Sequence, residues 1–233
     1  MNSPLSSAKF GTTRWTMIQQ AASYGLNDEN HSYALDLSEW ILQYRSPIYA
    51  YLRMRRYSRE DAEDILQGFL SYVIDKNVLS VVDKEKGKFR SFLLGVLKNY
   101  ISDQNRYNNA LKRGGKFEHV SSDEIKDLVD TTSTPEEIFD KEWAKSILAI
   151  TQEKLRSEVK EDILLGYLAW NQGEATYQEG ADLLGCSLSA FKSKVLKMRR
   201  LFQKLLKEEV AQTLPCADEY SVDEEIRVLM SCW

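Results

Sequence analysis

The sequence is poor in the residues that build metal sites and disulfide frameworks. It contains 3 cysteines and 2 histidines, and Cys186, Cys216 and Cys232 form no CxxC pair. This composition lacks the ligand spacing of zinc sites and predicts free thiols in a reducing cytoplasm. No signal peptide is apparent, and no apolar run approaches the roughly 20 residues that span a bilayer. We therefore expect a cytoplasmic protein with no membrane insertion, no metal and no cofactor.

Glycine, proline and strand-forming patterns are also scarce. The 233 residues include 11 glycines and 4 prolines, with 43% hydrophobic and 28% charged residues. Because no alternating run of β-branched residues is bounded by turns, the sequence predicts an all-α protein. We expect two helical bundle domains joined by a polar linker, the second containing a helix-turn-helix. The expected segments are an N-terminal extension 1–30, a domain 31–110, a linker 111–134, a domain 135–208 and an acidic tail 209–233.

The net charge of -4 argues against general binding of polyanions. Basic residues are instead concentrated in the segments Arg53–Arg59, Lys84–Lys116 and Lys192–Lys207. Acidic residues are concentrated elsewhere, most clearly in the C-terminal tail. Local basic surfaces on an acidic protein predict DNA contact that is selective or delivered by a partner.

The stretch Thr176–Lys207 predicts two helices joined by a short glycine turn. Thr176 and Glu179 have the spacing of a capping box, and Gly185 is placed to end the first helix. A helix, a tight turn and a basic helix form the helix-turn-helix plan, in which the second helix enters the major groove. This stretch therefore predicts DNA binding.

The second helix of this pair, which Ser187 or Ser189 can cap, separates apolar from basic residues. At about a hundred degrees per residue, one face carries Phe191, Val195, Met198, Phe202 and Leu205. The opposite face and its flanks carry Ser189, Lys192, Ser193, Lys194, Lys197, Arg199, Arg200, Lys204 and Lys207. A solvated basic face without a ligand is the alternative interpretation.

Two earlier helical segments have polar faces that could receive partners. The segment 61–76 places Asp61 and Asp64 opposite an apolar stripe, which suits either a basic protein partner or plain solvation. In the segment 87–107, the outward groups include Lys98, Asn99, Asn105 and Arg106. Such groups can neutralise phosphates and pair with base edges, although an ordinary amphipathic helix has a similar pattern.

Together these motifs resemble those of RNA polymerase sigma factors of the extracytoplasmic-function (ECF) type. The segment 61–70, DAEDILQGFL, is similar to the polymerase-binding helix of that family. The segments 89–93, FRSFL, and 99–106 are similar to its promoter-melting helix, and 177–187, YQEGADLLGCS, to its helix-turn-helix. An N-terminal FGTTRW, a KRGG stretch and an acidic C-terminal tail resemble one ECF subgroup.

The resemblance implies a sigma factor that binds core RNA polymerase and directs promoter recognition, promoter opening and transcription initiation, without an active site of its own. It implies polymerase docking through Asp61, Asp64 and Gln67, and opened-strand binding through Lys98, Asn99, Asn105 and Arg106. It implies that the upstream duplex is contacted by Ser189, Lys192, Ser193, Lys194, Lys197, Arg200 and Lys204. The implied partners are core polymerase, promoter DNA as duplex and opened strand, and an anti-sigma protein as a further candidate.

The sequence departs from the family pattern at three positions. Gly180 stands where the family has an apolar residue, and glycine there costs roughly 1 kcal/mol in helix propensity. Phe191 replaces a smaller β-branched residue, and we expect its ring to fill the space beside Gly180. Gly68 also lies within the helix that resembles the polymerase-binding helix.

Two other functions fit parts of the sequence. A stand-alone helix-turn-helix transcriptional regulator would need no polymerase, but it leaves the segments 61–67 and 99–106 without a specific role. A metal-dependent nuclease could use Glu60, Asp61, Glu63 and Asp64, but neighbouring carboxylates on a helix point to different faces. We therefore expect a protein that is not an enzyme.

Control of activity stays open at this level, with an anti-sigma protein, phosphorylation and the tail as alternatives. The apolar residues of the tail can fold onto either domain or remain free: Ile226, Leu229, Met230 and Trp233.

Overall fold

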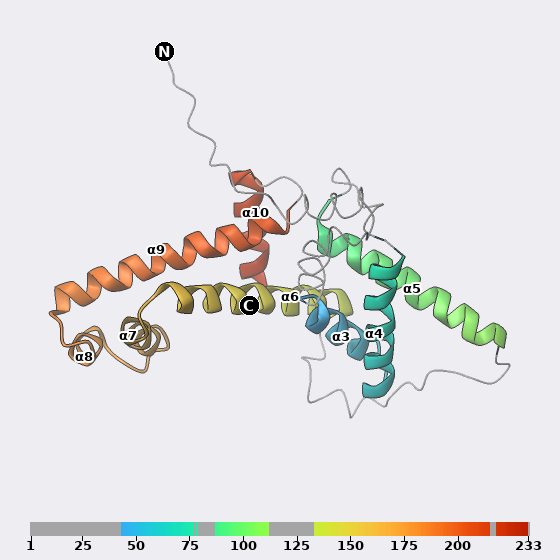
Figure 1. Ribbon diagram of the computed structural model, residues 1–233, viewed down its shortest axis with the longest axis horizontal. Coiled ribbons are helices and arrows are strands. Elements are labelled where there is room, and N and C mark those ends of the chain that lie inside the picture. Colours follow the sequence, from blue (N-terminus) through green and yellow to red (C-terminus); the bar gives the residue numbers. More distant parts are fainter. Residues whose placement is uncertain (1–42, 77, 79–86, 112–132, 215–217, 233) are drawn as a thin grey trace, which may run out of the picture. The chain divides into compact units, whose positions relative to one another are not determined.

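The computed structural model describes residues 43–76, 78, 87–111, 133–214 and 218–232. Within these ranges the chain forms eight helices, α3 to α10, and no strand, so the predicted all-α class is confirmed (Figure 1). The expected N-terminal extension and the linker residues 112–132 lie outside the described residues. None of the described helices is both long and apolar enough to cross a membrane.

The chain divides into two compact units. The first comprises Met1–Ser146 and Ala211–Trp233, and the second comprises Ile147–Val210. The chain passes from the first unit to the second within α6 (Pro135–Glu158) and returns within α9 (Leu188–Gln212). The expected second domain, 135–208, thus contributes to both units, whereas most of the expected tail, 209–233, belongs to the first.

The remaining helices of the first unit are α3 (Arg45–Met54), α4 (Arg59–Asp75), α5 (Phe89–Leu111) and α10 (Glu219–Ser231). Pro47 lies in the first turn of α3, where its missing N–H removes no helical hydrogen bond. Ser58 caps α4, because its hydroxyl accepts a 3.0 Å hydrogen bond from the N–H of Asp61. Thr134 and Glu137 form the reciprocal pair of bonds that begins α6.

Aromatic rings at the helix ends form much of the core of the first unit. The ring centroid of Tyr44 lies 5.5 Å from that of Phe89 in α5 and 6.5 Å from that of Phe139 in α6. These three side chains and Trp143 are buried. Because aromatic side chains remove large apolar areas from water, this cluster holds the starts of α5 and α6 together.

The second unit contains the end of α6, then α7 (Glu161–Asn171), α8 (Tyr177–Leu183) and most of α9. Its core consists of Leu155, Leu164, Tyr167, Ala181, Phe191, Val195, Met198 and Leu205. The predicted apolar face of α9 is therefore buried, apart from Phe202, which is partly buried against this core. Glu209, also buried, forms an ion pair with Lys154 and so connects α9 with α6 inside this unit.

Candidate nucleic-acid interface

The turn between α8 and α9 follows from local sequence rules. The Thr176 N–H donates a 2.7 Å hydrogen bond to Glu179, whose own N–H donates to the Thr176 hydroxyl over 3.2 Å. The bond from the Thr176 backbone lowers the pKa of Glu179, so the cap keeps its negative charge at the start of α8. Gly185 has φ 57°, a conformation that suits glycine, and Ser187 caps α9 by accepting from the N–H of Ala190 over 3.2 Å. The predicted capping box and the Ser187 cap are confirmed.

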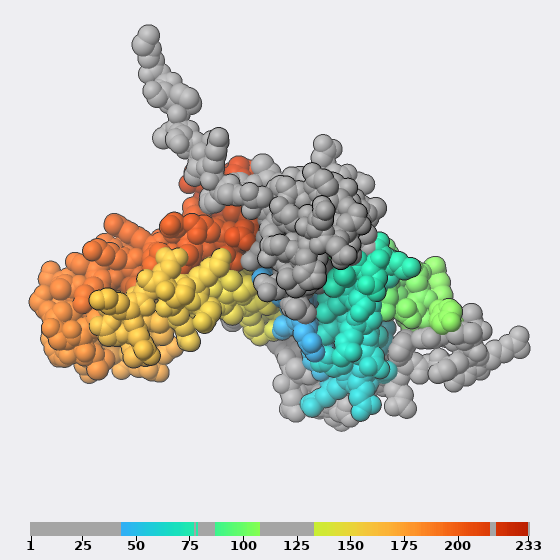
Figure 2. All heavy atoms as spheres, viewed as in Figure 1, coloured from blue at the N-terminus to red at the C-terminus, as the bar shows by residue number. Residues whose placement is uncertain are grey.

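The basic residues of α9 lie on the side opposite the core. Among the predicted DNA-contacting residues, those with exposed side chains are Ser189, Lys192, Ser193, Lys197, Arg200 and Lys204. Lys194 is half-buried, and Lys204 lies 3.7 Å from Glu208. Figure 2 draws most of α9 in orange. The exposed side of α9 from Ser189 to Lys204 is called the basic face below.

An aromatic cluster supports the basic face from behind. The ring of Tyr177 lies 4.9 Å from that of Trp170 and 6.1 Å from that of Phe191. Two cations of α9 cover this cluster: the Arg199 guanidinium lies 4.6 Å from the Trp170 ring centroid, and the Lys192 amino group lies 5.7 Å from that of Tyr177. Cation–π contacts of this kind contribute about 0.5–1 kcal/mol at exposed sites and restrict the orientation of the cation.

The supporting roles of Trp170 and Tyr177 were missed at the level of sequence. Both are aromatic residues on either side of the Gly173 turn, which has φ 77°. The only local signal is their position at the end of one helix and the start of the next. Their contact with cations of α9 depends on how α7, α8 and α9 pack, which no residue spacing specifies.

The unusual glycine in α8 is explained by its neighbour. A Cβ atom at Gly180 would lie 2.3 Å from Cζ of Phe191 and 2.5 Å from Cε1, too close for any side chain. The expectation that the Phe191 ring fills the space beside Gly180 is therefore confirmed. Gly166 in α7 is similarly restricted, since a Cβ there would meet Leu184 at 2.1 Å. Gly166 thus lets α7 lie close to the end of α8, and Gly180 lets α8 lie close to α9.

The predicted opened-strand residues lie on α5 in three different environments. Lys98 forms a 2.8 Å ion pair with Glu136, and this contact raises the pKa of Lys98 and lowers that of Glu136. Asn99 is exposed and Asn105 is half-buried, whereas Arg106 is exposed and lies 3.6 Å from Asp103. Tyr107, next to Arg106, is 62% exposed and was missed by the sequence analysis. An exposed ring beside a cation suits stacking on an unpaired base.

The predicted polymerase-docking residues lie along α4. Asp64 and Gln67 are exposed, while Asp61 is half-buried and accepts a 2.9 Å hydrogen bond from the Ser58 hydroxyl. Asp61 therefore contributes to the cap of its own helix, which leaves Asp64 and Gln67 as the more available pair. In the part of the chain that the structure describes, no group of three or more His, Cys, Asp or Glu residues could hold a metal ion.

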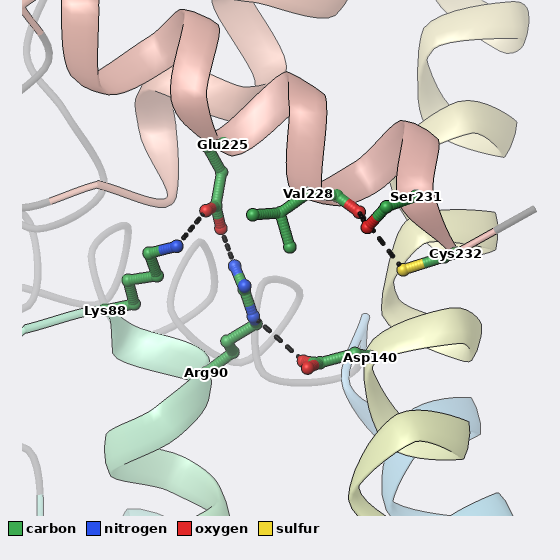
Figure 3. A network of polar contacts seen from close by, with 7 residues as sticks. All are labelled: Lys88, Arg90, Asp140, Glu225, Val228, Ser231 and Cys232. Carbon is green, nitrogen blue, oxygen red and sulfur yellow. Dashed lines mark hydrogen bonds and ion pairs between the residues drawn. The ribbon is translucent and has the colours of Figure 1, made fainter. Parts of the chain in front are cut away.

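A partly buried group of charges, in which Arg90 and Glu225 are the buried members, lies around the start of α5 and was not anticipated (Figure 3). The Arg90 guanidinium forms ion pairs with Asp140 of α6 at 2.9 Å and with Glu225 of α10. Lys88 forms a second ion pair with Glu225 at 2.5 Å, and Arg90 also lies 4.3 Å from the ring centroid of Trp143. This group is called the α10 charge cluster below.

The expected acidic tail thus contains a docked helix. Asp218 caps α10 through a 2.9 Å hydrogen bond from the N–H of Ser221, and Val222 and Leu229 are buried on the same side as Glu225. At the far end, the thiol of Cys232 donates to the Val228 carbonyl over 3.3 Å, and burial raises the pKa of this thiol.

The sequence matches no protein-family model and none of the curated proteins. The functional interpretation therefore rests on the geometry of the basic face, of α4 and of α5.

Proposed function

We propose that the protein is a sigma factor that binds core RNA polymerase and directs promoter recognition, promoter opening and transcription initiation. The basic face is the observation that carries this proposal. It presents cations and hydroxyls on one side of a helix that begins after a tight, capped turn, with no acidic residue from 188 to 207. Helices of this kind enter the major groove, where lysine and arginine contact base edges and phosphates.

The chemistry of the basic face divides naturally into positioning and reading. Ser193 and Lys197 lie in the N-terminal half of α9, the part of a recognition helix that meets base edges. Lys192 precedes them and Arg200 and Lys204 follow them along the exposed side, where these cations would contact phosphates. The duplex is therefore held by the flanking cations and read by Ser193 and Lys197.

Exposed groups on α4 and α5 support a sigma factor over a simple DNA-binding protein. On α5, the exposed Asn99, Arg106 and Tyr107 combine an amide, a cation and a ring, which suits an unpaired strand better than a duplex. Extruding a base costs a few kcal/mol, and capturing it on such a surface offsets that cost. On α4, Asp64 and Gln67 offer an acidic and amide surface for a basic partner such as polymerase.

Run-off transcription tests the proposal. The purified chain is added to bacterial core polymerase with genomic fragments as templates, and discrete transcripts that depend on the chain are expected. Asp64→Arg is expected to abolish co-purification with core polymerase, with Asp75→Arg, at the other end of α4, as the matched control. Tight duplex binding without polymerase, together with no stimulation of transcription, would favour a stand-alone helix-turn-helix regulator instead.

A further inference from the structure

The position of Glu225 is unusual for a residue in an acidic C-terminal segment. Its side chain is 1% exposed and lies between the buried Val222 and Leu229 on the inner side of α10. Its carboxylate forms ion pairs with both Lys88 and Arg90, the first two cations at the start of α5 (Figure 3). The remaining acidic residues of α10 are at least partly exposed. Glu225 is thus directed at the very helix to which opened-strand binding is assigned.

The α10 charge cluster is balanced as a whole. Two cations, Lys88 and Arg90, face two carboxylates, Asp140 and Glu225. Asp140 is 41% exposed and contacts Arg90 from α6, so it stays in place whether or not α10 is docked. Without Glu225, Arg90 would keep Asp140 as its ion-pair partner, whereas Lys88, already 38% exposed, would lose its ion pair and keep the longer-range attraction of Asp140 and Glu224.

A phosphate group and a carboxylate compete for the same cations. Guanidinium groups bind both anions through parallel N–H donors, and ammonium groups bind phosphate as point charges. A buried ion pair contributes little net stability compared with apolar packing, since desolvation offsets much of the attraction. An anion that approaches from solvent can therefore compete with Glu225 at modest cost in folding free energy.

We propose that α10 is an intramolecular competitor of nucleic acid, in which the Glu225 carboxylate occupies the cations Lys88 and Arg90 that would otherwise contact phosphates of the opened strand. This proposal rests on the proposed function in one respect, namely that the competing anion is a single nucleic-acid strand. Because coupling between two binding events is reciprocal, strand binding must weaken the docking of α10 as much as docked α10 weakens strand binding.

The first test compares two full-length variants in binding to a short oligodeoxythymidylate at several salt concentrations. Glu225→Gln removes the competing charge, and Glu219→Gln is the matched control, because Glu219 belongs to the same helix but is exposed at its start. Glu225→Gln is expected to bind several-fold more tightly at low salt. Its plot of log K against log salt is expected to be steeper by about 0.7, the value for one additional phosphate contact on a single strand. Equal affinity and slope in the two variants would overturn the proposal.

The second test uses the unaltered chain and does not depend on the folding of a variant. Amide hydrogen exchange is measured from Val222 to Leu229 with and without the same oligonucleotide. Faster exchange in its presence is expected, because the strand displaces α10, whereas unchanged or slower exchange would show that α10 is only a structural part of the first unit. A chain that binds oligonucleotide in this way but fails to direct transcription by core polymerase would overturn the proposed function and leave the competition intact.

Discussion

Each unit of the protein places an arginine over a tryptophan ring, and the two arginines have opposite surroundings. Arg90 lies 4.3 Å from Trp143, is 8% exposed, and forms ion pairs with Asp140 and Glu225. Arg199 lies 4.6 Å from Trp170 but is exposed, on a stretch of α9 that contains no acidic residue. The arginine–tryptophan contact therefore occurs once within a cluster in which carboxylates neutralise the arginine, and once beside the exposed basic face.

The difference follows from the cost of burying charge. A guanidinium removed from water is stabilised by acceptors, which for Arg90 are two carboxylates and for the buried Arg53 include the Tyr57 carbonyl. An exposed guanidinium needs none, and the tryptophan ring only restricts its orientation. We infer that buried Arg90 holds helices together for as long as α10 is docked, whereas exposed cations such as Arg199 are available for a polyanion throughout. The following changes test this division.

The largest effect is expected on the exposed side. Lys197→Glu reverses a charge in the middle of the basic face, so promoter-directed run-off transcription should be lost while co-purification with core polymerase persists. The free energy of unfolding should change by less than about 0.5 kcal/mol, because Lys197 is exposed. Lys160→Glu, an exposed residue of the same unit outside α9, is the control and should transcribe normally. Normal transcription by Lys197→Glu would contradict the role of the basic face.

The next largest effect is expected on the free energy of unfolding when Arg90 of the α10 charge cluster is replaced. Arg90→Met leaves Glu225 buried with only Lys88 as a partner, and losing one member of a buried pair costs about 3–5 kcal/mol. Urea unfolding of the full chain measures this loss. The double variant Arg90→Met with Glu225→Met should lose clearly less, since no carboxylate is then left buried without its guanidinium.

Arg199→Met provides the comparison for that experiment. Its loss should not exceed about 1 kcal/mol, the contribution of an exposed cation–π contact. Equal losses at the two arginines would contradict the division between buried and exposed cations.

The elements that the sequence predicted correctly depend on contacts within one turn of helix. The capping box at Thr176 joins residues three apart, so spacing alone identifies it, and the caps at Ser58 and Thr134 have the same spacing. The apolar face of α9 follows from helical periodicity in the same way. The all-α class needed no more than these local patterns.

The α10 charge cluster could not be predicted in this way. Arg90 and Glu225 lie far apart in the sequence, and an acidic residue in an acidic segment gives no sign that it is buried. Lys98 and Glu136 form a similar case, because both belong to helices whose exposed faces looked fully solvated. Such pairs depend on which helices meet, and that choice is made by aromatic packing such as that of Tyr44 against Phe89 and Phe139.

A smaller effect on the free energy of unfolding is expected at Gly180, where the contact between helices depends on packing and not on charge. Docking of α10 uses ion pairs, whereas α8 meets α9 through the fit of Phe191 against Gly180. Gly180→Ala places a methyl group 2.3 Å from a buried ring atom, and overpacking of this kind costs about 1–3 kcal/mol. This cost should exceed the gain in helix propensity of about 1 kcal/mol.

Phe191→Val tests whether the two positions act together. Alone it should destabilise the second unit by leaving a cavity, but combined with Gly180→Ala it should cost less than the sum of the single changes. Contacting residues show coupling of about 0.5–3 kcal/mol in such cycles, measured here by urea unfolding. Strict additivity would contradict the fit between the glycine and the ring.

The smallest effect is expected at Lys98 and Glu136, which are intermediate between the two classes, with side chains 44% and 45% exposed. Glu136→Gln should cost no more than about 1 kcal/mol, because solvent screens an exposed pair. The hydrogen bond with Lys98 lowers the pKa of Glu136 in the folded protein. The pair therefore stabilises the fold at pH values above the range in which an unfolded glutamate titrates, and this stabilisation is lost as the pH falls through the folded pKa of Glu136. The same bond raises the pKa of Lys98, so the stabilisation is also lost as pH rises through the folded pKa of the lysine.

Unfolding free energies of the unaltered chain and Glu136→Gln should therefore differ near neutral pH and converge in both acid and strong alkali. The variant should also bind oligodeoxythymidylate more tightly, because Lys98 loses the carboxylate that now engages it and becomes equivalent to the cations of the basic face. Glu137→Gln, the adjacent exposed residue, is the control for net charge, and its effect should appear in the cap of α6 and not in strand binding. Two results would contradict this interpretation. One is a difference in unfolding free energy that persists below the pH range in which glutamate titrates, and the other is an unchanged affinity of Glu136→Gln for the strand. Either result would show that Lys98 has a structural role like that of the buried cations.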